Sequence, residues 1–229
     1  MVIKGCMFDF SGTLMRIEPA GRWLDAVLTA AGHDVPAGQA ARYAERLERA
    51  GALPGGAHPS AVPEALREVW QERDRSAEQH RAAFTGMARQ AELPWDVYDA
   101  LYDRHMTPAA WTPYPDAAEV LGELRGRGTA VAVVSNIGWD LRPVFRAHGL
   151  DAFVDAYVLS FEHGIQKPDP RLFTIACEAL GLPPAQVAMV GDDRRADTGA
   201  AALGSPVHLV DHLPADERPD GLRKILDLL

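Results

Sequence analysis

Five short apolar runs, each followed by polar or turn-forming residues, constrain the fold of this 229-residue chain more than any other feature. The runs are continuous rather than alternating, which is typical of strands buried on both faces of a parallel sheet. Helical stretches separate most of them, and several end in glycine, a frequent helix C-cap. The alternation predicts an α/β fold with a doubly wound parallel sheet. The runs are residues 2–8, 129–134, 153–159, 186–190 and 206–210, and the helical stretches are residues 116–127, 141–148, 170–180 and 197–203.

A long segment between the first two runs interrupts this alternation. Residues 17–107 are rich in Ala, Arg, Glu and Leu at helical spacing and hold no convincing β run. We therefore expect an inserted all-helical domain of residues 17–107 and an α/β domain of residues 1–16 and 108–229. Residues 107–115, which include three prolines, are predicted to be a linker. Helices are expected at residues 21–31, 39–50, 64–73, 78–92 and 95–105.

Composition restricts the classes of partner. The chain has 32 acidic and 23 basic residues, and its net charge of -9 argues against binding nucleic acids or anionic membranes. No apolar stretch approaches the roughly 20 residues of a spanning helix, and the N-terminal residues do not resemble a signal peptide. Cys6 and Cys177 lie among apolar neighbours, which favours buried thiols over a disulfide. We expect a cytoplasmic protein without nucleic-acid or membrane partners, and the sequence does not indicate its oligomeric state.

Polar residues gather where the predicted strands end. Asp9, Ser135 and Asp192 follow three of the runs, and Lys167 lies a few residues beyond a fourth. Ligands of open parallel sheets bind outside the carboxyl ends of the strands. Several carboxylates at one edge repel each other and are normally held by a cation. A hard divalent ion, Mg²⁺ above all, suits such oxygen ligands and leaves a site that can hold a phosphoryl group.

Four ordered segments resemble the motifs of the haloacid dehalogenase-like (HAD) hydrolase superfamily. The helical insertion between the first and second of them resembles the small helical cap of the superfamily's first subfamily. The resemblance covers the whole predicted α/β part and implies a Rossmann-like hydrolase core with an inserted cap domain. The segments are FDFSGTL at residues 8–14, VSN at residues 134–136, KP at residues 167–168 and VGDDRRADTGA at residues 190–200.

The resemblance implies a chemical role for each matching residue. Asp9 would be the nucleophile and would form an aspartyl-phosphate, a covalent intermediate that carboxylates support. Ser135, Asn136 and adjacent backbone amides would bind phosphoryl oxygens. Lys167 would screen the charge between Asp9 and the phosphate. The expected substrate is a small phosphorylated metabolite.

The resemblance also implies a Mg²⁺ site. Asp9, the backbone carbonyl of Ser11, and Asp192 would hold the ion. Asp197 or Asp193 would complete its inner or outer shell, and the five-residue step from Asp192 to Asp197 favours Asp197.

Ser11 departs from the pattern of the superfamily's phosphatases, which carry a second Asp at this position as general acid and base. A hydroxyl cannot deliver a proton as a carboxylic acid does, and such transfer is typically worth about 10²–10⁴-fold in rate. The prediction is therefore a Mg²⁺-dependent phosphatase whose acid–base function is weakened. One alternative is a catalytically impaired phosphate-binding or regulatory protein. The other is a metal-independent 2-haloacid dehalogenase, which the retention of Asp192 and Asp197 disfavours.

The residues that recognise the leaving group are weakly encoded. Arginine pairs with anions and tryptophan stacks on flat groups, so two arginines and two tryptophans are candidates. For Trp23, packing at the domain junction is the favoured interpretation. No lysine lies between residues 5 and 166, which excludes the Schiff-base mechanism of phosphonate-cleaving relatives. The candidates are Arg16, Arg22, Trp139 and Trp23.

The histidines do not suggest a metal site. None of the eight shows the His-Glu-x-x-His spacing of a zinc site. His208 and His212 are expected on an exposed edge loop.

Overall fold

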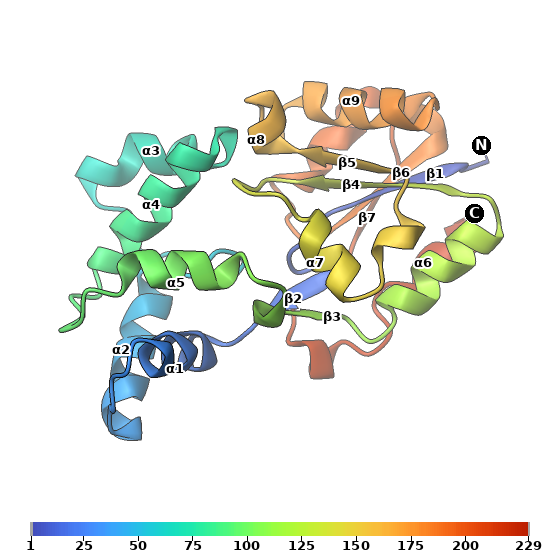
Figure 1. Ribbon diagram of the computed structural model, residues 1–229. Coiled ribbons are helices and arrows are strands. Elements are labelled where there is room, and N and C mark those ends of the chain that lie inside the picture. The colour runs from blue at the N-terminus through green and yellow to red at the C-terminus, as the bar shows by residue number, and fades with distance from the viewer. Residues whose placement is uncertain (1, 229) are drawn as a thin grey trace.

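The computed structural model describes residues 2–228 and places a five-stranded parallel sheet at the centre of the α/β part (Figure 1). The strand order is β5-β4-β1-β6-β7. The chain starts in the middle and adds strands first on one side and then on the other, which confirms the predicted doubly wound α/β fold. The strands are β1 (Gly5–Phe8), β4 (Ala130–Ser135), β5 (Ala156–Leu159), β6 (Val187–Gly191) and β7 (Val207–Leu209).

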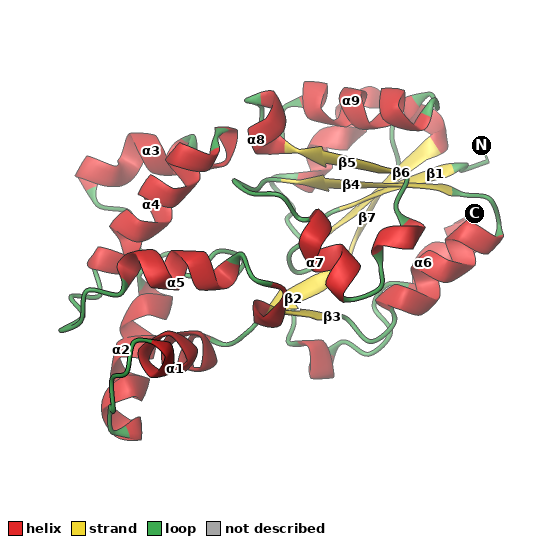
Figure 2. Ribbon diagram, viewed as in Figure 1, coloured by secondary structure: helices red, strands yellow, loops and turns green. Residues whose placement is uncertain are grey.

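Helices cover both faces of the sheet (Figure 2). Cys6 and Phe8 of β1 belong to the apolar cluster that includes α6 (Ala117–Gly126) and α7 (Arg142–Ala147). Met7, between them, belongs to the cluster on the other face with α9 (Pro170–Leu180). Because every residue of β1 is buried against one layer or the other, its sequence is apolar without alternation.

The remaining elements of the α/β part are short. The strand expected over residues 153–159 is shorter, because Phe153 ends a 3₁₀ turn and β5 begins at Ala156. Residues 197–203 form a 3₁₀ helix rather than an α-helix. The short elements are α8 (Ser160–His163) and the 3₁₀ turns Pro108–Ala110, Asp151–Phe153, Pro184–Gln186, Asp197–Leu203, Ala215–Glu217 and Arg223–Leu228.

The helices of residues 17–107 lie together at one side of the sheet (Figure 1). The helix expected at residues 64–73 is broken into a short α-helix between 3₁₀ turns. Ser76 begins the next helix, where its hydroxyl accepts a hydrogen bond from the Gln79 amide at 3.1 Å. The elements are α1 (Ala20–Ala30), α2 (Ala37–Arg49), Glu64–Leu66, α3 (Arg67–Gln71), Arg73–Arg75, α4 (Ala77–Arg89) and α5 (Tyr98–His105).

A two-stranded ribbon joins the helical segment to the sheet. Antiparallel β2 (Met15–Ile17) and β3 (Trp111–Pro113) pair across the point where the chain leaves the α/β part and returns to it. Within the linker predicted over residues 107–115, residues 111–113 form a strand that the sequence analysis did not predict. The prolines masked a strand whose pairing partner lies about 100 residues earlier, and Pro113 occupies an end position where a proline is tolerated.

Among residues 2–228, no helix combines the length and the apolar character that crossing a bilayer requires. Cys6 and Cys177 are buried free thiols.

Candidate active site

The carboxyl ends of three neighbouring strands bring predicted residues together. Asp9 follows β1, Ser135 ends β4 and Asp192 follows β6, and β1 lies between the other two strands. Gly12 allows the loop after β1 to approach Asp192. Its φ is +80°, and a Cβ at this position would lie 2.4 Å from the Asp192 Oδ2 atom. The three polar strand ends therefore share one edge of the sheet.

Lys167 joins two carboxylates at this edge. Its Nζ atom donates to Asp9 Oδ1 at 2.7 Å and to Asp197 Oδ1 at 2.6 Å. The Lys167 side chain is 2% exposed, and that of Asp197 is fully buried. One buried cation thus bridges two buried anions, an arrangement that requires the charges to compensate each other.

The electrostatics of this cluster leave negative charge uncompensated. Burial raises the pKa of Asp9 to about 8, against the opposing effect of Lys167, and the charges of Asp197 and Asp192 raise it further. Burial lowers the pKa of Lys167, but its two carboxylate partners outweigh this effect and hold the pKa above its ordinary value. Three carboxylates with one lysine favour the binding of a further cation.

The donor atoms fit a hard divalent ion. Asp9, Asp192 and Asp197 each offer one carboxylate oxygen, and these oxygens lie within 4.8 Å of one another. Such an all-oxygen set suits Mg²⁺, because this small cation prefers carboxylate ligands together with water and phosphate oxygens. All three carboxylates are therefore candidate ligands.

The two other candidate acids have structural partners. Both oxygens of Asp197 are engaged, one by Lys167 and one by the Asp193 amide at 2.9 Å. Both oxygens of Asp192 are also engaged, by Thr13 and His212, so these contacts do not rank the two carboxylates as metal ligands. Asp193 Oδ1 accepts from the amides of Arg195 at 2.7 Å and Ala196 at 3.0 Å, and so stabilises the turn of its own loop.

Asn136 orients Lys167. Its side-chain amide donates to the Lys167 carbonyl at 3.0 Å and accepts from the Lys167 backbone amide at 2.6 Å. Both polar atoms of the Asn136 side chain are therefore used to hold the backbone that carries the lysine. Ser135 lies 2% exposed at the strand end and lines the cavity with Asn136.

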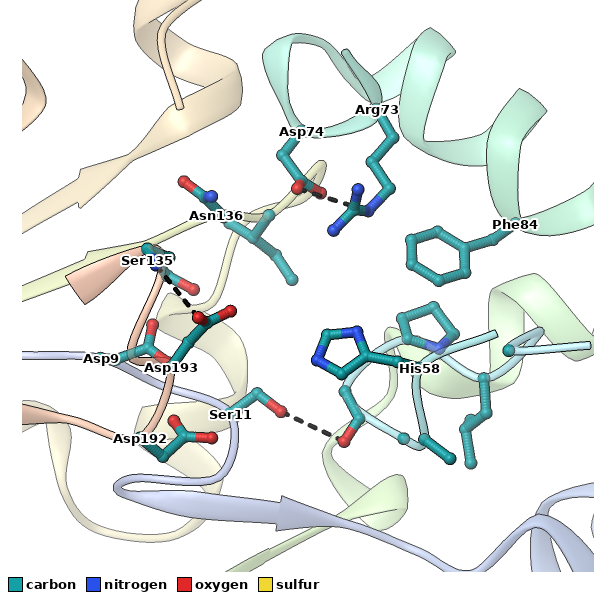
Figure 3. Close-up of a pocket in the computed structure, with 18 of the residues that line it drawn as sticks. Asp9, Ser11, His58, Arg73, Asp74, Phe84, Ser135, Asn136, Asp192 and Asp193 are labelled. Carbon is teal, nitrogen blue, oxygen red and sulfur yellow. Dashed lines mark hydrogen bonds and ion pairs between the residues drawn. The ribbon is translucent and has the colours of Figure 1, made fainter. Parts of the chain in front are cut away.

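A cavity of about 460 Å³ lies between this sheet edge and the helical segment (Figure 3). Its floor holds the polar strand ends and Lys167. Its opposite wall comes from the loop of residues 51–59 and from residues of and beside α3 and α4. Sequence reasoning did not single out the residues of that wall, which include His58, Trp70, Arg73, Asp74, His80 and Phe84.

Among the wall residues that the sequence analysis did not identify, Arg73 and Asp74 form an ion pair beside Trp70. Arg73 stacks on the Trp70 ring at 4.4 Å and pairs with buried Asp74 at 3.5 Å (Figure 3). The tertiary structure directs the pair toward the cavity.

The structure places the predicted leaving-group residues away from the cavity lining. Trp139 is 7% exposed and packs against Phe10, Trp111 and His105. Arg16 instead donates to the Gly55 carbonyl at 3.3 Å and holds the 51–59 loop. The physical reason is that an apolar aromatic cluster behind the site offers Trp139 more burial than the cavity does.

The two remaining candidates also lie elsewhere. Arg22 is exposed on α1. Trp23 is buried, as packing at the junction requires, and its indole donates to the Leu101 carbonyl at 2.9 Å.

His212 is exposed on the loop after edge strand β7, as the sequence suggested, and it also contacts the site. Its Nδ1 atom lies 2.5 Å from Asp192 Oδ2, and its Nε2 atom contacts Arg16. Asp192 also accepts from the Thr13 hydroxyl at 2.8 Å. Burial raises the pKa of Asp192, but the stronger combined effect of His212, Thr13 and Lys167 keeps it below its ordinary value.

Comparison with known proteins identifies the family. Residues 3–204 match the haloacid dehalogenase-like hydrolase family. This protein is a HAD-like hydrolase. The match spans most of the chain, confirms the predicted family, and confirms that the protein is a hydrolase.

Relatives of this hydrolase catalyse two different reactions. It is 33% identical to phosphoserine phosphatase of Thermus thermophilus over 192 aligned residues, and these residues cover 83% of this chain and 67% of that protein. It is 29% identical over 203 residues to (S)-2-haloacid dehalogenase 1 of a Pseudomonas species, which covers 88% and 82%. The crystal structure of a dehalogenase superposes with a TM-score of 0.65 at 25% identity, covering 99% and 97%. Similarity alone therefore leaves both reactions open, and the choice between them depends on the site.

Proposed function

We propose that this hydrolase is a Mg²⁺-dependent phosphatase that acts on a small phosphorylated metabolite. The observation that carries the proposal is the cluster of Asp9, Asp192 and Asp197 around Lys167, which holds three carboxylates but one cation. A divalent ion and the phosphoryl group of a substrate complete such a site. Its relatives include a phosphoserine phosphatase, which is consistent with this reaction.

The residues of this site perform distinct steps in the proposed reaction. Asp9 attacks phosphorus and forms the aspartyl-phosphate. Lys167, fixed by Asn136, keeps its charge beside Asp9 and offsets the repulsion between the carboxylate and the approaching phosphate. Ser135 and the amides after β4 bind phosphoryl oxygens. Mg²⁺ at Asp9, Asp192 and the Ser11 carbonyl, with Asp197 behind them, would neutralise developing charge on the phosphoryl group.

We further propose that residues 17–107 act as the cap of a first-subfamily enzyme over the α/β domain of residues 1–16 and 108–229. The cavity between them supports this division, since its floor comes from the sheet and its roof from the helical segment. Closure of such a roof excludes water from the reacting groups. A volume of about 460 Å³ limits the substrate to a small molecule.

Asp192 separates this proposal from the dehalogenase alternative. A haloacid dehalogenase needs an aspartate nucleophile but no metal, so a further carboxylate beside Asp9 would raise the cost of ionising the nucleophile without benefit. Here the charge of Asp192 raises the pKa of Asp9, and the pKa of Asp192 itself is held low by His212 and Thr13, against the effect of burial. A carboxylate whose pKa is held low beside the proposed nucleophile suits a metal-dependent reaction.

Ser11 supports a second candidate function, a phosphate-binding or regulatory protein with little turnover. A titration with Mg²⁺ and beryllium fluoride, a mimic of the aspartyl-phosphate, tests the site that both candidates require. We expect Mg²⁺ and beryllium fluoride to bind cooperatively to the native protein. Asp9→Asn should no longer bind beryllium fluoride. Binding of neither would exclude both candidates.

Turnover then distinguishes the two candidates. We expect the native protein with Mg²⁺ to release inorganic phosphate from small phosphate esters, and folded Asp9→Asn to release none. Cooperative binding without any phosphate release would favour the binding protein. Activity that survives in Asp9→Asn would remove Asp9 as the nucleophile.

A further inference from the structure

The proposed phosphatase reaction, on which this inference rests, needs a proton for the leaving group. The hydroxyl of Ser11 stands where the superfamily's phosphatases carry a carboxylic acid, and its Oγ atom lies 3.5 Å from the Gly55 carbonyl oxygen. A hydroxyl at its ordinary pKa gives up a proton poorly at neutral pH. Another group in the same cavity has to supply the proton if esters with poor leaving groups are to be cleaved.

Three titratable groups at the floor of the cavity are already hydrogen-bonded to, or in contact with, other protein groups. The Asp192 carboxylate is hydrogen-bonded to Thr13 and His212. The other ring nitrogen of His212 contacts Arg16, so neither nitrogen is directed at a substrate. Asp193 accepts two backbone amides of its own loop. None of these groups is free to face the leaving oxygen.

Two titratable groups of the wall are also unsuited to this step. His80 Nδ1 lies 2.7 Å from the Tyr102 hydroxyl, and burial lowers the pKa of His80 well below its ordinary value, so the ring is neutral. Asp74 is 4% exposed and faces Arg73 at the side of the cavity opposite Ser11 (Figure 3). Burial raises the pKa of Asp74, which makes this residue the competitor that an experiment has to exclude.

His58 lines the same cavity as Ser11, the position of the missing acid. It is exposed, lines the cavity, and directs its ring into the space between Ser11 and the α4 side of the wall (Figure 3). In the part of the chain that the structure describes, the His58 ring has no hydrogen-bond or ion-pair partner. Both of its nitrogens are therefore free for a substrate.

The loop that carries His58 is held over Ser11. Arg16 donates to the Gly55 carbonyl at 3.3 Å. Gly55 has a φ of +75°, and a Cβ there would lie 2.4 Å from Ser11 Oγ and 2.9 Å from the Trp111 ring. The small side chain at position 11 and the glycine at position 55 together let the loop approach closely. This approach brings the imidazole, three residues later, into the cavity.

We propose that His58 is the general acid of this hydrolase and donates the leaving-group proton in place of the carboxylic acid absent at Ser11. As Asp9 forms its bond to phosphorus, the bond from phosphorus to the ester oxygen breaks and its electron pair moves to that oxygen. The oxygen takes the proton of the His58 imidazolium and departs as an alcohol. Neutral His58 next takes a proton from water, whose oxygen attacks phosphorus. The bond from phosphorus to Asp9 breaks, which restores the carboxylate and yields inorganic phosphate.

The test is a series of phosphate monoesters with leaving groups from nitrophenol to simple alkyl alcohols, assayed with Mg²⁺ on native protein and His58→Gln. For native protein we expect Asp9-dependent hydrolysis of alkyl as well as aryl esters. For His58→Gln we expect kcat/KM to fall by about 10²–10⁴-fold on alkyl esters and by less than about tenfold on nitrophenyl phosphate. The difference arises because nitrophenolate leaves without a proton.

Two control variants separate proton donation from structural effects. His33→Gln alters an exposed histidine of the helical segment that lies outside the cavity lining, and should match native protein on every ester. Asp74→Asn should not reproduce the dependence on the leaving group, and thermal melts should show that His58→Gln is folded.

Three outcomes overturn the role of His58. They are an equal loss across the series in His58→Gln, a leaving-group-dependent loss in Asp74→Asn instead, and a native protein that cleaves aryl but not alkyl esters. In each of these cases the proposed phosphatase stands. Absence of Asp9-dependent hydrolysis of any ester removes the proposed phosphatase, and the role of His58 with it.

Discussion

Replacing Asp9 by Asn should stabilise the metal-depleted protein, and by more at pH 7 than at pH 5. Burial raises the pKa of Asp9 to about 8 in the folded state, while in the unfolded chain its pKa is near 4. Below pH 4 Asp9 is protonated in both states and this difference has no effect. As the pH rises toward 8, the unfolded chain ionises Asp9 before the folded protein does. The unfolded state is therefore increasingly favoured.

The size of the effect follows from proton linkage. One proton held by the folded state alone changes the free energy of unfolding by about 1.4 kcal/mol per pH unit. Two pH units thus give an upper limit of about 2.7 kcal/mol. Lys167 pairs with both Asp9 and Asp197. Part of the pH dependence of stability therefore comes from Asp197, and this part is present in native protein and in Asp9→Asn alike. We expect the stability advantage of Asp9→Asn to grow by about 1–3 kcal/mol from pH 5 to pH 7.

Urea unfolding of native protein and Asp9→Asn at pH 5, 6 and 7 in EDTA measures this advantage. Asp25→Asn, at an exposed position of α1, controls for the loss of one surface carboxylate and should show no such trend. Saturating Mg²⁺ should reverse the order of stability at pH 7, because the ion binds the carboxylate of the native protein. A difference between native protein and Asp9→Asn that stays flat or shrinks from pH 5 to pH 7 would refute the reasoning.

Three further changes have defined outcomes. Lys167→Met removes the cation that pairs with fully buried Asp197, so it should cost about 3–5 kcal/mol in urea unfolding at pH 7; a loss below about 1 kcal/mol would contradict a structural role for this pair. Gly55→Ala places a Cβ 2.4 Å from Ser11 Oγ at a φ of +75°, so it should displace the loop and lower kcat/KM at least about tenfold. The control Gly38→Ala has open space around its Cβ and should keep native activity; equal activities of the two variants would show that the loop position is unimportant. In a halide-release assay on short 2-halo acids with chelator present, we expect no release; sustained release that depends on Asp9 would establish the dehalogenase reaction instead.

The α/β architecture was predictable because its signals are local. A strand buried on both faces has to be apolar along its whole length, as β1 and β4 are, and its polar continuation has to lie at the sheet edge. Asp9, Ser135 and Asp192 therefore had to meet once the strand order placed β1 between β4 and β6. The expected domain division and the assigned roles of the site residues remain predictions that the experiments above address.

The other half of the site depends on contacts between distant segments. β3 pairs with β2 across about 95 residues of chain, and this ribbon sets where the 51–59 loop meets Ser11. His212 reaches Asp192 from a loop after β7, which no local pattern indicates. Trp139 turns inward because an aromatic cluster from three separate segments offers it burial.

The sequence by itself determined which polar residues end the strands, and it singled out Lys167 and the carboxylates of the candidate site. Only the tertiary structure decided which side chains face that cluster from the helical segment. The physical reason is the range of the forces involved. Strand burial and turn formation are specified within a few residues, whereas the direction of His58 or Asp74 depends on how the helical segment packs against the sheet edge across the cavity.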